Sequence, residues 1–213
     1  MFFPAFSIFL DFLILHAIAS SRVTITLIIL FLAPIKSHAE PIYTFPVPNC
    51  KVTYARAHHD YPANDILGKK GCPFVAVTSG EVIDVNRKDR YKWNVNDPAT
   101  RGGRWVAILG DDGVRYYGSH LLSVADGIEV GVRVNAGDLL GALGDSGDAK
   151  GTAPHVHFGI SWPTPKGIWW VRRGELYPWK YLDGWKAGKD LNPAKAVAAL
   201  EKKVGTVPVH TGY

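Results

Sequence analysis

The chain has 213 residues, of which 47% are hydrophobic and 20% are charged, and its formal net charge is +5. This length suits one domain with tails, and the composition is typical of a folded globular protein rather than a disordered one. The mild positive charge would favour an anionic surface, but it is too small to identify one. Because Lys and Arg do not cluster with interleaved aromatic residues, we do not expect nucleic-acid binding.

Two apolar runs occupy the N-terminal segment. The first covers residues 2–18, and the second, VTITLIILFLAP, follows Arg22. The basic residue, the apolar run and the small residues Ser37 and Ala39 are typical of an export signal that is cleaved after Ala39. Each run is shorter than the ~20 residues of a spanning helix, but together they are long enough for a membrane anchor. We therefore predict that residues 1–39 are an export signal or a membrane anchor, and that the protein is secreted or held in the cell envelope.

The chain contains two cysteines, Cys50 and Cys72, and both follow the predicted signal. In an oxidising compartment an even number of cysteines predicts a disulfide, here between these two residues. Closing a loop of this size is worth roughly 3 kcal/mol. Two unpaired buried thiols are the alternative.

Short apolar runs separated by Gly, Asp and Asn begin after Pro48. Residues 74–85 form an alternating run with a break at Ser79-Gly80. Residues 104–121 read as strand, Asp-Asp-Gly turn and strand, which predicts a hairpin. Residues 127–147 form further short strands with glycine corners, whereas the polar, irregular residues 86–103 predict an inserted loop at the rim.

The C-terminal part has a different composition. Residues 161–185 hold five of the seven tryptophans, which either pack an irregular extension onto the sheet or form a wall for a ligand. Residues 192–204 predict a helix with Asn192 as N-cap and Pro193 at its first position. The fold class is therefore all-β, an antiparallel sandwich or barrel-like core at residues 40–162, followed by an aromatic-rich, short helical extension at 163–213.

The stretch APHVHFGIS places two histidines on one face of a strand. Side chains alternate along an extended chain, so His155 and His157 share a face while Val156 and Phe158 point to the core. A single strand histidine is usually structural. Two imidazoles side by side repel when protonated, and they gain most by sharing a metal or a proton.

Four other polar residues could complete such a site: His58, His59, Asp65 and His120. Catalytic zinc sites commonly have three protein ligands and one open position, so two histidines and one aspartate from distant segments would satisfy the ligand count. The histidines left over could transfer protons in metal-assisted hydrolysis. Alternatively, each residue is an ordinary hydrogen-bonded side chain. Of the remaining histidines, His16, His38 and His210 show no pattern that indicates a role.

These motifs together resemble those of the lysostaphin-type peptidoglycan endopeptidases. The resemblance covers roughly residues 45–162 and is carried by a His and an Asp before a D-I strand, by Y-x-x-H-L, and by GDSG followed by GTAPHVHF. It implies a zinc-dependent, β-rich metallopeptidase core and the hydrolysis of peptide bonds in the bacterial cell wall. The aromatic-rich extension lies outside the resemblance.

The resemblance assigns roles residue by residue. It implies that Asp65 and His157 bind Zn²⁺, that His155 helps to activate the attacking water, and that His120 orients the water or stabilises the developing oxyanion. The third ligand departs from the family's H-x-x-x-D pattern, since Tyr61 stands four residues before Asp65. We prefer His59 because it keeps even strand parity with Asp65.

His58 remains the alternative third ligand. The leading prediction for the whole chain is an exported zinc endopeptidase that cleaves peptide cross-links of peptidoglycan and acts as a monomer. Because this histidine is displaced from the family's pattern, an alternative is that the protein is a catalytically inactive relative, which binds the cell wall or regulates another hydrolase. A disulfide-stapled β protein without metal is a third alternative.

Overall fold

The computed structural model describes residues 42–58 and 60–210, so the predicted signal or anchor at 1–39 and the predicted ligand His59 lie outside the described residues. In chain order, the elements are β1 (Asn64–Leu67), β2 (Pro73–Val75), β3 (Gly80–Asn86), the 3₁₀ helix η1 (Pro98–Thr100), β4 (Trp105–Gly110), β5 (Arg115–Ser119), β6 (Ser123–Val124), β7 (Arg133–Val134), β8 (Leu139–Ala142), the 3₁₀ helix η2 (Gly147–Ala149), β9 (His155–Ser161), α1 (Trp169–Arg172), α2 (Trp179–Lys186) and α3 (Ala194–Val204).

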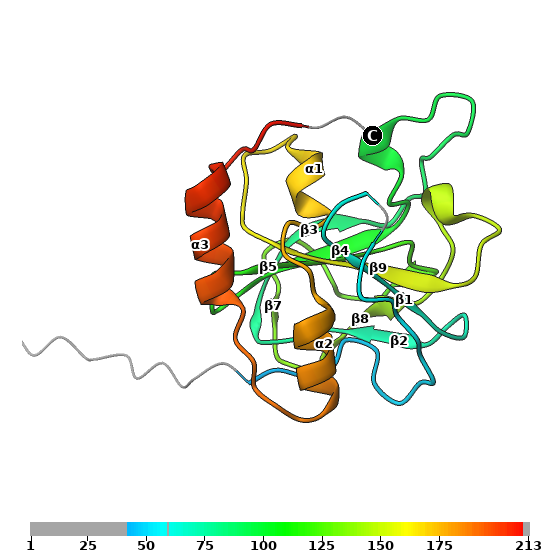
Figure 1. The fold of residues 1–213 in the computed structure, drawn as a ribbon. Coiled ribbons are helices and arrows are strands. Elements are labelled where there is room, and N and C mark those ends of the chain that lie inside the picture. The colour runs from blue at the N-terminus through cyan, green and yellow to red at the C-terminus, as the bar shows by residue number, and fades with distance from the viewer. Residues whose placement is uncertain (1–41, 59, 211–213) are drawn as a thin grey trace, which may run out of the picture. The chain divides into compact units, whose positions relative to one another are not determined.

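The strands form two antiparallel sheets. The larger has the order β1-β9-β5-β4-β3-β7 and the smaller has the order β2-β8-β6. Figure 1 shows the three α-helices, α1, α2 and α3, after the last strand, in the C-terminal part of the described chain. The prediction of an antiparallel all-β core with a short helical extension is therefore confirmed.

The predicted hairpin at residues 104–121 is present as β4 and β5. Its turn closes with hydrogen bonds from Gly110 N to Val114 O at 2.8 Å and from Gly113 N to Gly110 O at 2.9 Å. Gly113 has φ +78°, a conformation that costs glycine little because it has no Cβ. The Asp112 carboxylate accepts a hydrogen bond from Val114 N at 3.0 Å. The Asp-Asp-Gly pattern therefore predicted this turn correctly.

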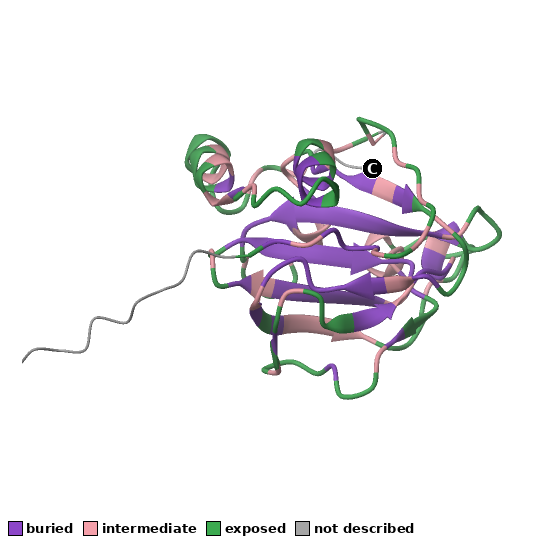
Figure 2. Cartoon of the chain, turned by 90° about the horizontal axis from the view of Figure 1, so that it is seen from below, coloured by how far each residue is buried: buried purple, intermediate pink, exposed green. Residues whose placement is uncertain are grey.

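The core lies between the two sheets. Val156, Phe158 and Ile160 of β9 are fully buried, as the alternation predicted, and the whole of β9 is buried. Figure 2 shows the buried strands in purple in the middle of the folded part. At Gly118 in β5, an added Cβ would collide with the ring of Phe74 in β2, so glycine lets the sheets approach. Burying an aromatic side chain of this size contributes ~1.5–3 kcal/mol.

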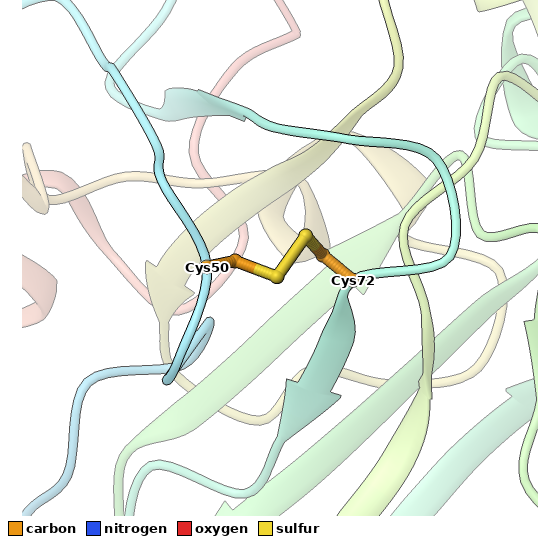
Figure 3. The surroundings of a disulfide bond; sticks show 2 residues. All are labelled: Cys50 and Cys72. Carbon is orange, nitrogen blue, oxygen red and sulfur yellow. A yellow bond between two sulfur atoms is a disulfide. The ribbon is translucent and has the colours of Figure 1, made fainter.

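A disulfide joins Cys50 to Cys72, with their Cα atoms 6.2 Å apart. Figure 3 shows that it ties the segment that precedes β1 to the residue directly before β2. The bond encloses the segment that carries His58 and Asp65. This pairing was predicted from the sequence.

The extension packs mainly onto the core. Trp162 and Trp185 are buried, and Trp185 stacks on Tyr43 with ring centroids 5.5 Å apart. Helix α3 begins at Ala194, one residue later than predicted, and Asn192 Oδ1 accepts a hydrogen bond from Ala194 N at 2.8 Å. Within residues 42–58 and 60–210, none of the helices has both the length and the hydrophobicity needed to cross a bilayer.

Candidate metal centre

The register of two neighbouring strands brings Asp65 and His157 together. In the antiparallel pairing of β1 with β9, Asp65 lies opposite His157. Side chains at directly opposed positions of a sheet point to the same face, so their polar atoms can meet. His157 Nδ1 lies 2.9 Å from Asp65 Oδ1, although the two residues are 92 positions apart in the sequence.

His58 supplies the third donor of this group. One ligand atom from each of His58, Asp65 and His157 lies within 4.8 Å of the others. His58 Nε2 is 3.7 Å from Asp65 Oδ2, and the His58 ring stands edge-on to the His157 ring at 5.0 Å. The structure therefore places His58, the alternative third ligand, beside Asp65 and His157. The preferred residue, His59, lies outside the described residues, so its assignment stays a prediction.

The hydrogen bonds of His157 fix which of its nitrogens faces the cluster. Its Nε2 lies 2.8 Å from the backbone carbonyl of Arg173. A carbonyl oxygen can only accept, so Nε2 must carry the hydrogen. In a neutral imidazole, Nδ1 then presents a lone pair to the Asp65 carboxylate. Two acceptors at 2.9 Å repel unless a proton or a cation lies between them.

The donor set fits zinc. Two imidazole nitrogens and a carboxylate oxygen are common ligands of catalytic zinc, and a carbonyl that holds the second nitrogen of a ligating histidine is a usual partner. The Arg173 carbonyl reaches His157 because it packs against Gly159, where an added Cβ would collide with it. The backbone after α1 therefore orients a candidate ligand.

The electrostatics of Asp65 favour its ionised form. Burial alone would raise the pKa of Asp65, but the hydrogen bond and charge of His157, with His155 and His58, lower it far below its ordinary value. A carboxylate that stays ionised in a half-buried position is a suitable cation ligand.

His155 and His120 each present an unprotonated nitrogen beside the cluster. His155 Nδ1 donates to Ala153 O and His120 Nδ1 donates to Ser146 O, each at 2.8 Å, which leaves Nε2 as the acceptor in the neutral rings. The two rings are 4.9 Å apart. Burial lowers the pKa of His120 to about 3, and the neighbouring histidines contribute. His120 is therefore neutral at physiological pH.

The backbone around His120 is constrained. Its φ of +61° is uncommon for a residue other than glycine, and its N–H donates to Gly102 O at 2.9 Å. Such conformations persist where surrounding contacts impose them, often at functional sites. The loop that contains Gly102 therefore helps to place the His120 ring.

A cavity of about 410 Å³ surrounds these residues. Its lining includes His58, Asp65 and His157 of the cluster together with His120 and His155, and it adds residues that the sequence did not indicate as functional. The added ionisable and aromatic residues are Asp60, Tyr61, Arg101, Tyr117, Asp148, Trp169, Arg172 and Arg173. They come from the segment before β1, from the loop 86–103, from β5, from η2, and from α1 with the residue that follows it. Of the extension's tryptophans, Trp169 lines this cavity, whereas Trp185 is a core residue.

The extension is fixed by the C-terminal tail. Trp162 Nε1 donates to Thr206 O at 2.8 Å, and Trp170 Nε1 donates to Pro208 O at 3.0 Å. The His210 ring lies 4.9 Å from the Trp169 ring. His210, for which the sequence indicated no role, thus contacts a residue of the cavity wall.

A two-sheet antiparallel fold that places an aspartate and two histidines in one cavity defines a candidate metal-binding protein. The model of peptidase family M23 matches residues 60–167, roughly half of the chain. The chain belongs to this family. The match starts after His58 and ends before Trp169, so the candidate third ligand and one wall of the cavity lie outside it.

Several solved structures are similar to this chain at low sequence identity, and the match to lysostaphin supports a shared fold. Lysostaphin from Staphylococcus simulans is 22% identical with a TM-score of 0.50, and the match covers 71% of this chain and 58% of lysostaphin. Its catalytic domain alone is 21% identical with a TM-score of 0.48, and the match covers 66% of this chain and 98% of that domain. A zinc-containing peptidase from Vibrio cholerae is 22% identical with a TM-score of 0.43, covering 57% of this chain and 37% of that one. Among curated protein sequences, none matches.

Proposed function

We propose that the protein is an exported zinc endopeptidase that hydrolyses peptide cross-links of bacterial peptidoglycan. The observation that carries the proposal is the contact between His157 Nδ1 and Asp65 Oδ1 at 2.9 Å, with the other nitrogen of His157 held by a carbonyl. This arrangement requires a positive charge between the two groups. Zinc fits there with His58, Asp65 and His157 as its ligands.

His155 is the proposed general base. When bound, zinc supplies a Lewis acid that polarises the scissile carbonyl and lowers the pKa of water from about 15.7 to near 7. The free Nε2 of His155 takes the proton from the attacking water, because its Nδ1–H is already committed to Ala153 O. The resulting imidazolium returns that proton to the leaving amine.

His120 is proposed to orient the attacking water and to stabilise the developing oxyanion. Its ring lies 4.9 Å from that of His155 and 6.0 Å from that of His157, so it faces the same reacting atoms. Because its pKa is low, it begins as a neutral ring and gains a proton only when negative charge develops nearby. The Ser146 carbonyl, which accepts from Nδ1, would stabilise the protonated ring.

The proposed substrate and location rest on the family and on the disulfide. Membership of family M23 supports a peptidoglycan peptide as substrate, and the structurally similar lysostaphin is described as an antimicrobial peptidase. The Cys50–Cys72 disulfide supports an oxidising compartment outside the cytoplasm, in agreement with the apolar N-terminal segment.

The test is to incubate the purified protein with peptidoglycan and to identify the released muropeptides by mass spectrometry. We expect release that a zinc chelator abolishes, added zinc restores, and His157→Ala eliminates. Wall binding that persists without metal, together with no released peptide, would support the inactive wall-binding alternative and refute the enzyme.

A paired substitution tests the third ligand. His58→Ala should lower zinc affinity to the level of Asp65→Ala, while His59→Ala should leave it near that of the unchanged protein. The reverse result would establish His59, the residue that the alternation favours, and would remove His58 from the proposed site.

A further inference from the structure

Two arginines from separate segments line the cavity, and their side chains have no part in the mechanism above. Arg101 follows η1 in the loop 86–103, and Arg173 follows α1. A guanidinium group presents parallel N–H donors that match the two oxygens of a carboxylate. The two arginines are therefore candidate ligands for an anion in the cavity.

The Nε atom of Arg101 holds its side chain in place. Its Nε donates to Asn96 Oδ1 at 3.1 Å, and the same oxygen accepts from the Tyr91 hydroxyl at 2.9 Å. Among the described residues, the two terminal amino groups of Arg101 make no hydrogen bond. Asp148 is a nearby acid: burial raises the pKa of its carboxyl, and Arg101 lowers it. The loop thus orients Arg101 while its fork of donors remains available to a ligand.

Arg173 is positioned by aromatic rings. Its guanidinium carbon lies 4.0 Å from the centre of the Tyr61 ring and 5.0 Å from that of the Trp169 ring, and both rings line the cavity. Burial lowers the pKa of Arg173, the like charge of Arg101 lowers it further, and the acidic neighbours oppose this. Arg101 and Arg173 line the same cavity, so an anion bound there would be attracted by two positive charges.

The neighbouring Arg172 has a structural role in this cavity. It donates to Ala99 O at 2.7 Å, its other terminal nitrogen lies 3.6 Å from an Asp84 oxygen, and it stacks on Trp105 at 4.3 Å. These contacts tie Arg172 to the loop before β4 and to β3 and β4, and we do not include it in the anion site.

We propose that Arg101 and Arg173 bind a carboxylate of the substrate peptide beside the scissile bond, so that the protein selects cross-links that carry a free carboxylate. The inference rests on the proposed function, because it places this subsite next to the reacting atoms. Three arginines and three aspartates line the cavity, and a divalent cation at the metal centre adds positive charge that favours an anionic substrate. The carboxylate is either the C-terminus of the peptide or an acidic side chain.

The test uses the cross-linked muropeptide that the protein itself releases from peptidoglycan, prepared in four synthetic forms. These forms carry a free acid or an amide at the C-terminus, combined with an acid or an amide at the side chain. The ratio kcat/KM is measured for each form, and Kd is measured for analogues with a non-hydrolysable ketomethylene group at the scissile bond. Arg101→Gln and Arg173→Gln are compared with Arg90→Gln, which alters an exposed arginine of the same loop that does not line the cavity.

We expect one acid form to be preferred over its amide by about 10-fold or more in both kcat/KM and Kd, as for other hydrogen bonds to charged groups. The acid form that is preferred identifies which carboxylate is bound. Arg101→Gln and Arg173→Gln should bring kcat/KM and Kd for the acid to the values for its amide, whereas Arg90→Gln should retain the preference. Zinc content measured on every variant excludes loss of the metal.

Equal kcat/KM and Kd for acids and amides would overturn the inference while leaving the proposed function intact. A preference that survives both arginine substitutions would also overturn it. If the protein binds no zinc and releases no muropeptide, the proposed function fails, and the inference that rests on it fails as well.

Discussion

The disulfide encloses the segment that carries two of the proposed ligands, so its removal tests how the site is held. Cys50 and Cys72 are separated by 22 positions, and the chain-entropy relation gives about 3 kcal/mol for a loop of this size. The double substitution C50S and C72S should therefore lower the free energy of unfolding by about 3 kcal/mol and the Tm by roughly 6–12 °C. Guanidinium denaturation and thermal scans in the presence of a chelator measure the effect without zinc.

The same substitution should also weaken zinc binding, because His58 and Asp65 both lie in the released segment. Zinc affinity is measured by competition with a chromophoric chelator. Reducing the unmutated protein should reproduce both changes, and reoxidation should reverse them. The reasoning is refuted if the free energy of unfolding changes by less than about 1 kcal/mol and zinc affinity is unaltered.

Three further changes probe the cavity and its support. His155→Gln should lower kcat/KM by about 10²–10⁴-fold with zinc content unchanged, and a comparable loss of zinc would refute its role as a base. The neutral His120 ring makes the zinc-free fold less stable as the pH falls from about 6.5 towards 3, since the unfolded chain binds the proton more readily. Chelator-treated His120→Gln should therefore lose less stability than the parent between pH 7 and pH 4, and equal losses would contradict this. Deleting residues 206–213 leaves two indole N–H donors without their carbonyl acceptors and should cost about 1–3 kcal/mol for each donor left unsatisfied, measured by urea denaturation.

Local patterns predicted most of the fold. The Asp-Asp-Gly turn, the alternation in β9 and the positive φ available to glycine each depend on a few neighbouring residues. They predicted the β4–β5 hairpin and placed His155 and His157 on the face opposite the core. The two cysteines predicted their disulfide because no other partner exists in the sequence.

The parts of the site that the sequence did not indicate depend on irregular backbone and on contacts between distant residues. The parity argument for His59 assumed an extended strand up to Asp65, whereas β1 begins only at Asn64 and an irregular segment precedes it. Alternation of side chains does not hold in such a segment, so His58 can face the cluster. The Arg173 carbonyl is a backbone group, and no side-chain pattern predicts that it holds His157. Arg101 lies in a loop whose polarity indicated only exposure.

The most direct test of the central claim is anomalous diffraction at the zinc absorption edge from crystals of the zinc-loaded protein. We predict one strong peak within about 2.0–2.2 Å of His58 Nε2, an Asp65 carboxylate oxygen and His157 Nδ1. No peak at this position, or a peak held by other residues while Asp65 and His157 remain in direct contact, would contradict the account.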